Sequence, residues 1–390
     1  MTTLWATIVV IGVLVFVHEL GHYLAARSVG VRVERFSVGF PPRLFSFTSV
    51  ENGWDVKLFF YRMQNGKLEW GPIFEKKIIK KGRKGSLTEY VIALLPLGGY
   101  VKMAGVIDES MDTNISHAPD ELMSKSGLQQ MWVMSAGVIM NMIIAFLIFT
   151  GITFQTGIPE IHNEPLVSNV IEGMPAEAAG ILAGDRILSL NNEILITWDD
   201  LTEKIHSMPE KEVSVTWLSQ GDTLNASLKT SYQVAAIDGK VDTLGAIGIY
   251  PQVDYRAAGF VEGISVGARS TMGALGLIVL SMKMLVTGAA SLSDLGGPVM
   301  IAQLAGESAR AGILTLLSFM AFISVNLAFL NILPIPGLDG GHILVILIQM
   351  IIRRPLSINT KMKIQQIGMT LLLLLFVVVM FNDIGRLFNN

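Results

Sequence analysis

The sequence predicts a polytopic α-helical membrane protein with one β-rich domain inserted between two of its spans. Three observations lead to this fold class. Of the 390 residues, 51% are hydrophobic and only 16% are charged, whereas soluble domains usually carry about 25% charge. Four apolar stretches are long enough to cross a bilayer, which takes about 20 residues. Between the second and third stretches lies a polar segment with the alternating pattern of β-strands.

The four predicted transmembrane helices cover residues 1–26, 131–155, 311–352 and 364–383. Any one of them could instead be a buried core helix, but four in one chain favour a membrane. The first stretch also has the length of a signal peptide. No Lys or Arg precedes it and no small-residue cleavage site follows it, so we expect it to be retained as a span.

Basic residues orient the predicted spans. Residues 27–130 carry 15 Lys or Arg, and residues 353–363 carry four more. Because loops on the cytoplasmic side are enriched in these residues, we expect both segments in the cytoplasm. Both termini and residues 156–310 are then expected on the outer side of the membrane. The net charge of −3 gives no indication of a nucleic-acid partner.

The outer part is expected to contain two different structures. Residues 163–235 are polar, with alternating runs such as EVSVTWL at Glu212–Leu218, and predict a β-rich domain. Residues 256–290 are apolar but are interrupted by charges, which predicts an amphipathic helix lying in the membrane interface. A fifth span is the alternative for this second segment.

The sequence HELGH at residues 18–22 predicts a metal site. Two histidines four residues apart lie on one face of a helix, so His18 and His22 can share one ion. Glu19 stands beside them, where it can act as a general base toward the attacking water. Cysteine is absent, so the ligands must come from His, Asp or Glu, and two imidazoles suit zinc. A chance match on a surface helix is the alternative; the apolar stretch that precedes the motif argues against it.

The third zinc ligand is expected to be Asp339, within NILPIPGLDGG at residues 331–341. Prolines and glycines there break the helical backbone, and such backbone at membrane depth is tolerated only where it is buried in protein or lines a wet cavity. A kinked helix with a water-facing aspartate is the alternative. His342 is a rival ligand that we rank below Asp339, because it follows the Gly-Gly break.

Taken together, these motifs resemble the site-2 protease family of intramembrane zinc metalloproteases, specifically the bacterial RseP type. The likeness covers nearly the whole chain: HELGH, the NILPIPGLDGG element, LGGYVKM at residues 97–103 and RVERFSVGF at residues 32–40. It implies His18, His22 and Asp339 as zinc ligands, Glu19 as the general base, a four-span core, and a location in the bacterial inner membrane.

Two departures from the family pattern stand out. Relatives often carry GPxxN in the second span; here the segment at residues 137–141 reads GVIMN, without the proline but with Asn141. Some relatives carry two PDZ domains, whereas the insert here has room for one. Its segment GMPAEAAGILAGDRIL at residues 173–188 resembles the PDZ signature. We expect a PDZ-like domain on the periplasmic side that excludes bulky ectodomains, with an inert spacer as the alternative.

Cleavage within a bilayer requires the substrate helix to unwind, since its peptide bonds are hidden in its own hydrogen bonds. Residues 89–103 predict two short strands about a Pro/Gly turn, a hairpin that dips into the membrane and offers an edge to the substrate. An ordinary cytoplasmic hairpin is the alternative. Expected substrate-binding residues are Asn141, Asn331, Pro334, Pro336, Gly98 and Gly99. The two asparagines could instead make interhelical hydrogen bonds.

The predicted function is zinc-dependent hydrolysis of transmembrane segments, in regulated intramembrane proteolysis. Expected partners are the lipid bilayer and either single-span substrates with trimmed ectodomains, such as anti-sigma factors, or remnant signal peptides. Two alternatives belong to other classes. An inactive adaptor would bind partners through the PDZ-like domain, and a metal transporter would use His and Asp as an ion path. The intact HELGH and LDG motifs argue against the first, and the lack of internal repeats argues against the second.

Overall fold

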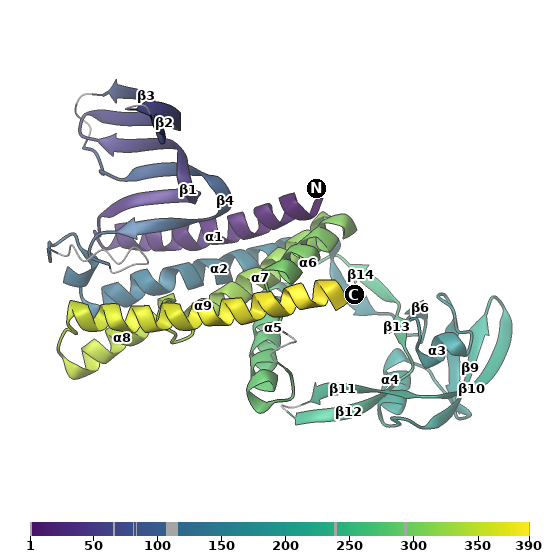
Figure 1. Cartoon of the computed structure of the whole chain (residues 1–390). Helices are drawn as coiled ribbons and strands as arrows, with labels where there is room; N and C mark the ends of the chain where they lie inside the picture. The colour runs from purple at the N-terminus through teal and green to yellow at the C-terminus, as the bar shows by residue number, and fades with distance from the viewer. Residues whose placement is uncertain are drawn as a thin grey trace. The chain divides into compact units, whose positions relative to one another are not determined.

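The computed structural model describes residues 2–64, 67–80, 82, 84–106, 116–237, 240–291 and 295–389. The chain divides into two compact units. One unit comprises Met1–Ile152 with Ile264–Asn390 and is mainly helical; the other comprises Thr153–Gly263 and is β-rich (Figure 1).

The helical unit is built around long apolar helices that run along a common direction: α1 (Thr2–Ser28), α2 (Gly127–Thr156), α7 (Ile313–Ile332) and α9 (Ile358–Asn389) (Figure 1). Small residues lie where these helices meet. Ala145 of α2 packs with Ala321 and Val325 of α7, and each of the three is fully buried. Small side chains allow helix backbones to approach closely, which is the usual basis of helix association in lipid.

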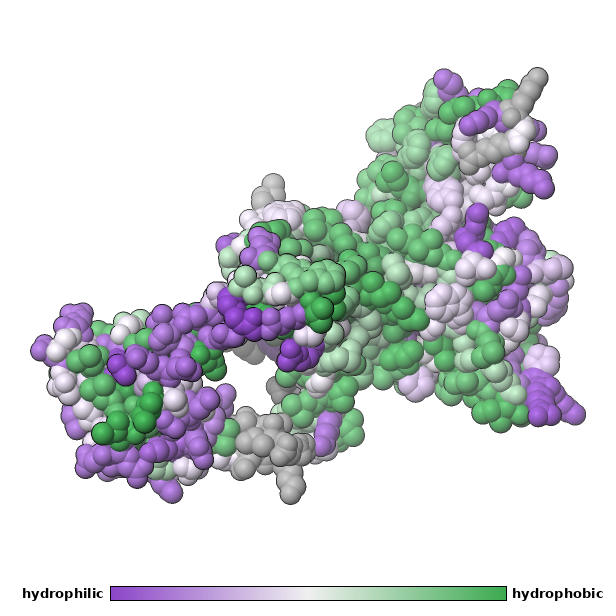
Figure 2. All heavy atoms as spheres, turned by 180° about the vertical axis from the view of Figure 1, so that it is seen from behind, coloured by the Kyte–Doolittle hydropathy of each residue, from purple (hydrophilic) through white to green (hydrophobic). Residues whose placement is uncertain are grey.

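The outer faces of these helices are apolar, and Figure 2 shows a broad hydrophobic surface over the helical part of the chain. Along α9, Leu373 and Leu374 are each 63% exposed and Phe381 is 80% exposed. Exposed apolar surface of this extent is typical of contact with lipid rather than water. Five of the described helices are long and apolar enough to cross a membrane: α1, α2, α5 (Phe260–Thr287), α7 and α9.

Helix α5 is the one of these five that was not among the four spans predicted from the sequence. It packs into the helical unit, since its Ala274 and Ile278 belong to the same buried cluster as Ala145 of α2. In Figure 1 α5 runs across α1, α2, α7 and α9 rather than along them. A helix that lies across the spans has the orientation expected of the predicted interfacial helix. Its length and composition would also allow it to span a membrane.

The predicted third span consists of two helices, α7 and α8 (Asp339–Ile352), with non-helical backbone between them. The break falls at the Pro/Gly-rich segment, as expected. A further helix, α6 (Pro298–Ala311), precedes α7. The buried Asp383 of α9 accepts hydrogen bonds from the backbone N–H groups of Gly297, Val299 and Met300, which caps the start of α6.

A four-stranded sheet of order β3-β2-β1-β4 follows α1 in the chain: β1 (Val33–Val50), β2 (Gly53–Gln64), β3 (Lys67–Ile79) and β4 (Glu89–Met103). Phe36 of β1 lies opposite both Tyr90 and Val101, so the first half of β1 pairs with both halves of β4. The predicted hairpin over residues 89–103 is therefore wrong in its pairing. Its two halves do not face each other, because β1 occupies the position between them.

The β-rich unit contains a four-stranded sheet of order β10-β9-β7-β8 and three two-stranded sheets, β11-β12, β13-β6 and β14-β5. Strands β13 and β14 pair with β6 and β5, which brings the start and the end of the unit together. The elements are β5 (Ile158–Ile161), β6 (Val167–Val170), α3 (Pro175–Ala178), β7 (Arg186–Leu190), β8 (Glu193–Ile194), α4 (Trp198–His206), β9 (Glu212–Ser219), β10 (Asp222–Lys229), β11 (Ser231–Ile237), β12 (Lys240–Ala246), β13 (Ile249–Pro251) and β14 (Val253–Arg256).

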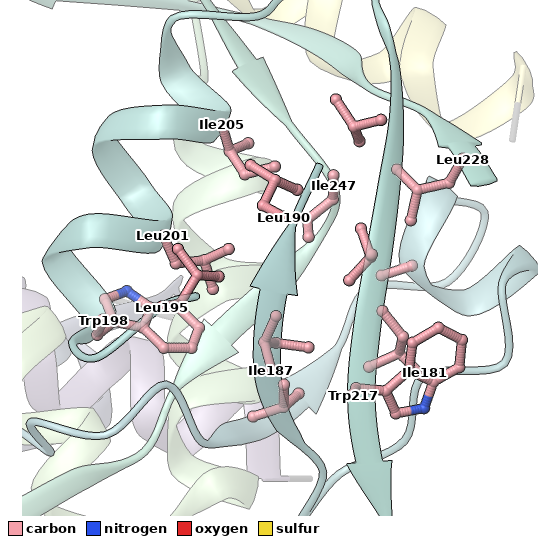
Figure 3. Close-up of a cluster of buried hydrophobic side chains, with 14 residues drawn as sticks. Ile181, Ile187, Leu190, Leu195, Trp198, Leu201, Ile205, Trp217, Leu228 and Ile247 are labelled. Carbon is pink, nitrogen blue, oxygen red and sulfur yellow. The ribbon is translucent and has the colours of Figure 1, made fainter. Parts of the chain in front are cut away.

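The core of this unit lies between α4 and the sheet (Figure 3). Every second residue of β9 faces inward: Val213, Val215 and Trp217 are all buried, as the alternating sequence predicts. The domain extends past the predicted boundary at residue 235. Ile247 is buried in the same core and the following strand, β13, pairs with β6, so the unit closes only with residues beyond that boundary.

Candidate active site

Helix α1 places His18 and His22 against α2, where both imidazoles are buried. Glycines permit this close approach. A Cβ atom on Gly21 would lie 2.5 Å from the carbonyl oxygen of Ala136. A Cβ on Gly137 would lie 2.5 Å from both His18 Cε1 and His22 Nε2. The two rings therefore occupy space that any side chain at residue 137 would fill.

The third group, Asp339, is the first residue of α8, and the broken backbone before α8 brings it to the imidazoles. Here too glycines are required. A Cβ on Gly340 would lie 2.2 Å from the carbonyl oxygen of Leu333, and one on Gly341 would lie 2.4 Å from that of Ile335. The Gly-Gly pair of the LDGG sequence thus lets the start of α8 pack directly on the preceding turn.

Three atoms converge on one point: His18 Nε2, His22 Nε2 and Asp339 Oδ2. The two nitrogens are 3.2 Å apart, and they lie 3.2 and 3.3 Å from the carboxylate oxygen. Of the described residues, this trio forms the group able to hold a metal ion. A tetrahedral zinc ion bound at about 2.0–2.1 Å has ligand atoms about 3.3–3.4 Å apart. The triangle thus has the size of one face of a zinc tetrahedron.

The hydrogen bond made by Nδ1 of each ring determines whether Nε2 presents a lone pair to the point where the three atoms converge. His22 Nδ1 lies 2.8 Å from the carbonyl oxygen of Val133, which only accepts, so Nδ1 carries the proton and Nε2 the lone pair. His18 Nδ1 lies 3.3 Å from the Asn141 amide. The amide oxygen of Asn141 is buried without a partner among the described residues. Turning the amide over would let it accept from His18 Nδ1–H.

Both imidazoles then direct lone pairs at a carboxylate oxygen, Asp339 Oδ2, that is itself buried without a hydrogen-bond partner in the described part of the chain. Three lone pairs facing one another are unfavourable unless a cation lies between them. Imidazoles fixed through their second nitrogen are the usual arrangement of zinc-binding histidines. The residues present therefore fit a zinc ion.

Glu19 lies next to the triangle on α1 and is tied to the sheet: the backbone N–H of Val101 in β4 donates to Glu19 Oε2 at 3.0 Å. Two glycines of β4 allow this strand to pack closely against α1 and β1. A Cβ on Gly98 would lie 3.2 Å from Val15 of α1, and one on Gly99 would lie 2.3 Å from the carbonyl oxygen of Ser37 in β1. Both glycines predicted as site residues thus belong to the strand that reaches Glu19.

The remaining predicted residues are not part of the triangle of ligand atoms. Asn331 lies in the last turn of α7, and of the described residues none forms a hydrogen bond with its side chain. Pro334 is exposed, while the backbone of Pro336 packs against Gly368 of α9. His342 lines a small hollow with Gly341 and is absent from the ligand triangle. Substrate binding by Asn331, Pro334 and Pro336 stays a prediction.

Several contributors to the site were not predicted from the sequence. The Val133 carbonyl and the Val101 N–H are backbone groups, so the type of residue at these positions does not reveal their role. Ser324 of α7 is fully buried and donates to the backbone carbonyl of Asn141 at 2.8 Å, which links α7 to α2 at the level of the site. Gly137 was noted only as part of a motif, although its missing side chain makes room for both rings.

These features define a class of protein: a multi-pass membrane metalloprotease with the zinc-binding HExxH sequence on a membrane helix. The model of peptidase family M50 matches residues 6–64 and 58–375. The chain belongs to this family, the site-2 proteases, which confirms the resemblance seen in the motifs. It is accordingly a zinc metalloprotease of the site-2 type.

Curated relatives are similar over almost their entire length. The regulator of sigma-W protease RasP of Bacillus subtilis is 32% identical over 427 residues, covering 99% of each chain. A relative from Clostridium perfringens, whose name describes a zinc metalloprotease, is 34% identical over 373 residues, covering 95% of each chain. Among solved structures, the PDZ domain of an SdrC-like protein of Listeria innocua is 25% identical, covering 24% of this chain and 99% of that one, with a TM-score of 0.19.

Proposed function

We propose that this protein holds zinc through His18, His22 and Asp339 and cleaves peptide bonds within transmembrane segments of other proteins. The observation that carries the proposal is the triangle of ligand atoms, 3.2–3.3 Å on each edge, formed by residues from α1 and α8. Zinc bound there supplies a Lewis acid beside the scissile carbonyl. The remaining tasks, which are proton transfer and substrate binding, are assigned to side-chain and backbone groups of the protein.

Glu19 is the proposed general base. It accepts the proton of the attacking water and passes it to the leaving amine, which requires its carboxylate to lie within hydrogen-bond reach of both. Its position next to His18 on α1 provides that reach. The hydrogen bond from Val101 fixes its orientation while no substrate is present.

Strand β4 is the proposed docking edge for unwound substrate. Successive N–H groups of a strand point to opposite edges. The Val101 N–H points toward Glu19 rather than toward β1, so the unpaired edge of this half of β4 faces α1. A substrate strand added there would run alongside Glu19. Gly98 and Gly99 keep the edge narrow, because neither bears a side chain.

The substrates proposed are single-span proteins with trimmed ectodomains, anti-sigma factors among them, or remnant signal peptides. The relative named regulator of sigma-W protease supports a role in regulated proteolysis. We place the protein in the bacterial inner membrane, with residues 27–130 and 353–363 in the cytoplasm. The β-rich unit is then periplasmic and acts as a PDZ-like filter against bulky ectodomains.

Glu19→Gln separates the proposed protease from an inactive adaptor. We expect the variant to keep its zinc, measured by elemental analysis, and to lose cleavage of a membrane-anchored reporter by at least about 100-fold. Glu51→Gln, at an exposed turn, is the matched control and should cleave normally. Asp339→Asn should lower zinc occupancy. Full cleavage by Glu19→Gln, or unchanged zinc in Asp339→Asn, would refute the corresponding role.

A further inference from the structure

The corner where α8 meets α9 borders an open cavity of about 510 Å³. Three basic residues line it: Arg353 and Arg354, which follow α8, and Lys361 in the first turns of α9. Its lining, as far as the chain is described, contains no Asp or Glu. A cavity of this size holds a small-molecule group, and its charge favours an anion.

No carboxylate of the described residues forms an ion pair with any of the three cations. Among the described residues, neither Arg353 nor Arg354 forms an ion pair, and the Lys361 ammonium donates its one hydrogen bond to Met123 Sδ, at 3.7 Å. Lys361 is half-buried. A half-buried ammonium without an anion nearby is unfavourable, so an external anion in the cavity would stabilise it.

Two helix N-termini add to the positive potential. Gly127, the first residue of α2, and Ile358, the first residue of α9, both line the cavity. The α9 start is ordered by Ser357, whose hydroxyl accepts from the Thr360 N–H at 3.1 Å. Helix N-termini carry partial positive charge and bind phosphate groups readily. Side chains and backbone therefore favour the same kind of ligand.

The walls of the cavity are fixed by contacts of their own. Gln349 of α8 accepts a hydrogen bond from the Leu356 N–H at 3.1 Å, which holds the segment that carries both arginines. On the opposite wall, Arg32 pairs with Asp120 at 2.8 Å and anchors the loop that contributes Met123. The cavity is thus formed before any ligand enters.

Apolar side chains also line the cavity, on the side next to the exposed apolar end of α8. Ile346 and Met350 of α8 contribute to it. Just before Arg353, Ile351 is 81% exposed and Ile352 is 49% exposed. Figure 2 shows hydrophilic atoms at this corner beside a hydrophobic surface, as expected where a bilayer ends. The ligand should accordingly have an anionic head and an apolar tail.

We propose that this cavity binds the phosphate headgroup of an anionic phospholipid of the phosphatidylglycerol kind. Arg353, Arg354 and Lys361 would contact the phosphate oxygens, and Ile346 and Met350 would contact the start of the acyl chains. Basic pockets between membrane helices are the usual sites for such headgroups. The ligand would hold the far end of α8, whose first residue is Asp339.

The test measures which lipids the purified protein retains. Protein in nanodiscs of mixed phosphatidylglycerol and phosphatidylcholine is released and examined by native mass spectrometry. We expect wild type to retain phosphatidylglycerol at least about tenfold above its bulk share, and Lys361→Met to lower this enrichment about fivefold. Lys361→Met keeps both arginines, so the charges that orient the chain in the membrane are preserved.

A triple variant, Arg353→Gln with Arg354→Gln and Lys361→Met, should show no enrichment. The control, Lys76→Gln with Lys77→Gln and Lys80→Gln, removes the same charge from exposed residues at the end of β3 and should behave as wild type. No enrichment in wild type, or equal loss in the control, would overturn the proposal. So would displacement of the lipid by an equal concentration of inorganic phosphate. The readout involves no cleavage, so it stands apart from the proposed peptidase reaction.

Discussion

Replacing Gly137 by alanine should empty the metal site while leaving the fold in place. The added Cβ would lie 2.5 Å from His18 Cε1 and from His22 Nε2, and 2.7 Å from His18 Nδ1. Carbon atoms in normal contact are about 3.5 Å apart or more, so one or both rings must move by roughly 1 Å. Metal–ligand distances tolerate only about 0.2 Å. A displacement of this size at a catalytic group costs about 100-fold in rate.

We therefore expect Gly137→Ala to bind zinc at least about 100-fold more weakly, measured by chelator competition, and to lose reporter cleavage to a similar degree. Gly151→Ala is the matched control: it adds the same methyl group to the same helix where nothing lies within 4 Å, and alanine favours a helix over glycine. Stoichiometric zinc and wild-type cleavage in Gly137→Ala would show that the rings shift without cost and would refute the close packing of α1 on α2.

Three further changes test other contacts. Asn141→Leu removes the side-chain partner of His18 at similar volume and should weaken zinc binding by about 10–100-fold; unchanged affinity would mean that Asn141 does not orient the ring. Asp383→Ala leaves three N–H groups at the start of α6 without their acceptor and should cost about 1–3 kcal/mol, measured by thermal unfolding in detergent, whereas an unaltered transition would contradict the cap. Trp217→Ala should cost about 3–5 kcal/mol in the β-rich unit and expose that unit to limited proteolysis; equal resistance to wild type would argue against the core of Figure 3.

The sequence predicted those parts of the fold whose signal is local. The HELGH spacing places two histidines on one helix face, and the structure shows both rings turned to one point. The Pro/Gly-rich segment before Asp339 predicted a broken helix, and the break lies there. The alternation in EVSVTWL predicted a half-buried strand, and β9 buries every second residue.

The features missed depend on contacts between distant segments. Residues 89–103 carry the turn residues of a hairpin, but nothing local shows that β1 would lie between the two halves. The predicted end of the β-rich domain at residue 235 was wrong for the same reason, because β13 belongs to this unit only through its pairing with β6. Helix α5 is apolar enough for a span, and its direction follows from packing against α2 and α7.

In the proposed reaction, the hydrogen bond between Val101 and Glu19 would join substrate binding to catalysis. While no substrate is present, the Val101 N–H occupies one oxygen of the proposed base. A substrate strand pairing along this edge of β4 needs the same N–H for one of its own carbonyls. Pairing would then release the Glu19 carboxylate just as a peptide bond arrives beside it. A helical segment cannot make this exchange, because its carbonyls are already bonded within the helix. The proposed base would thus be freed only by a chain that has unwound, and this exchange would restrict hydrolysis to peptide bonds in the extended conformation that cleavage requires.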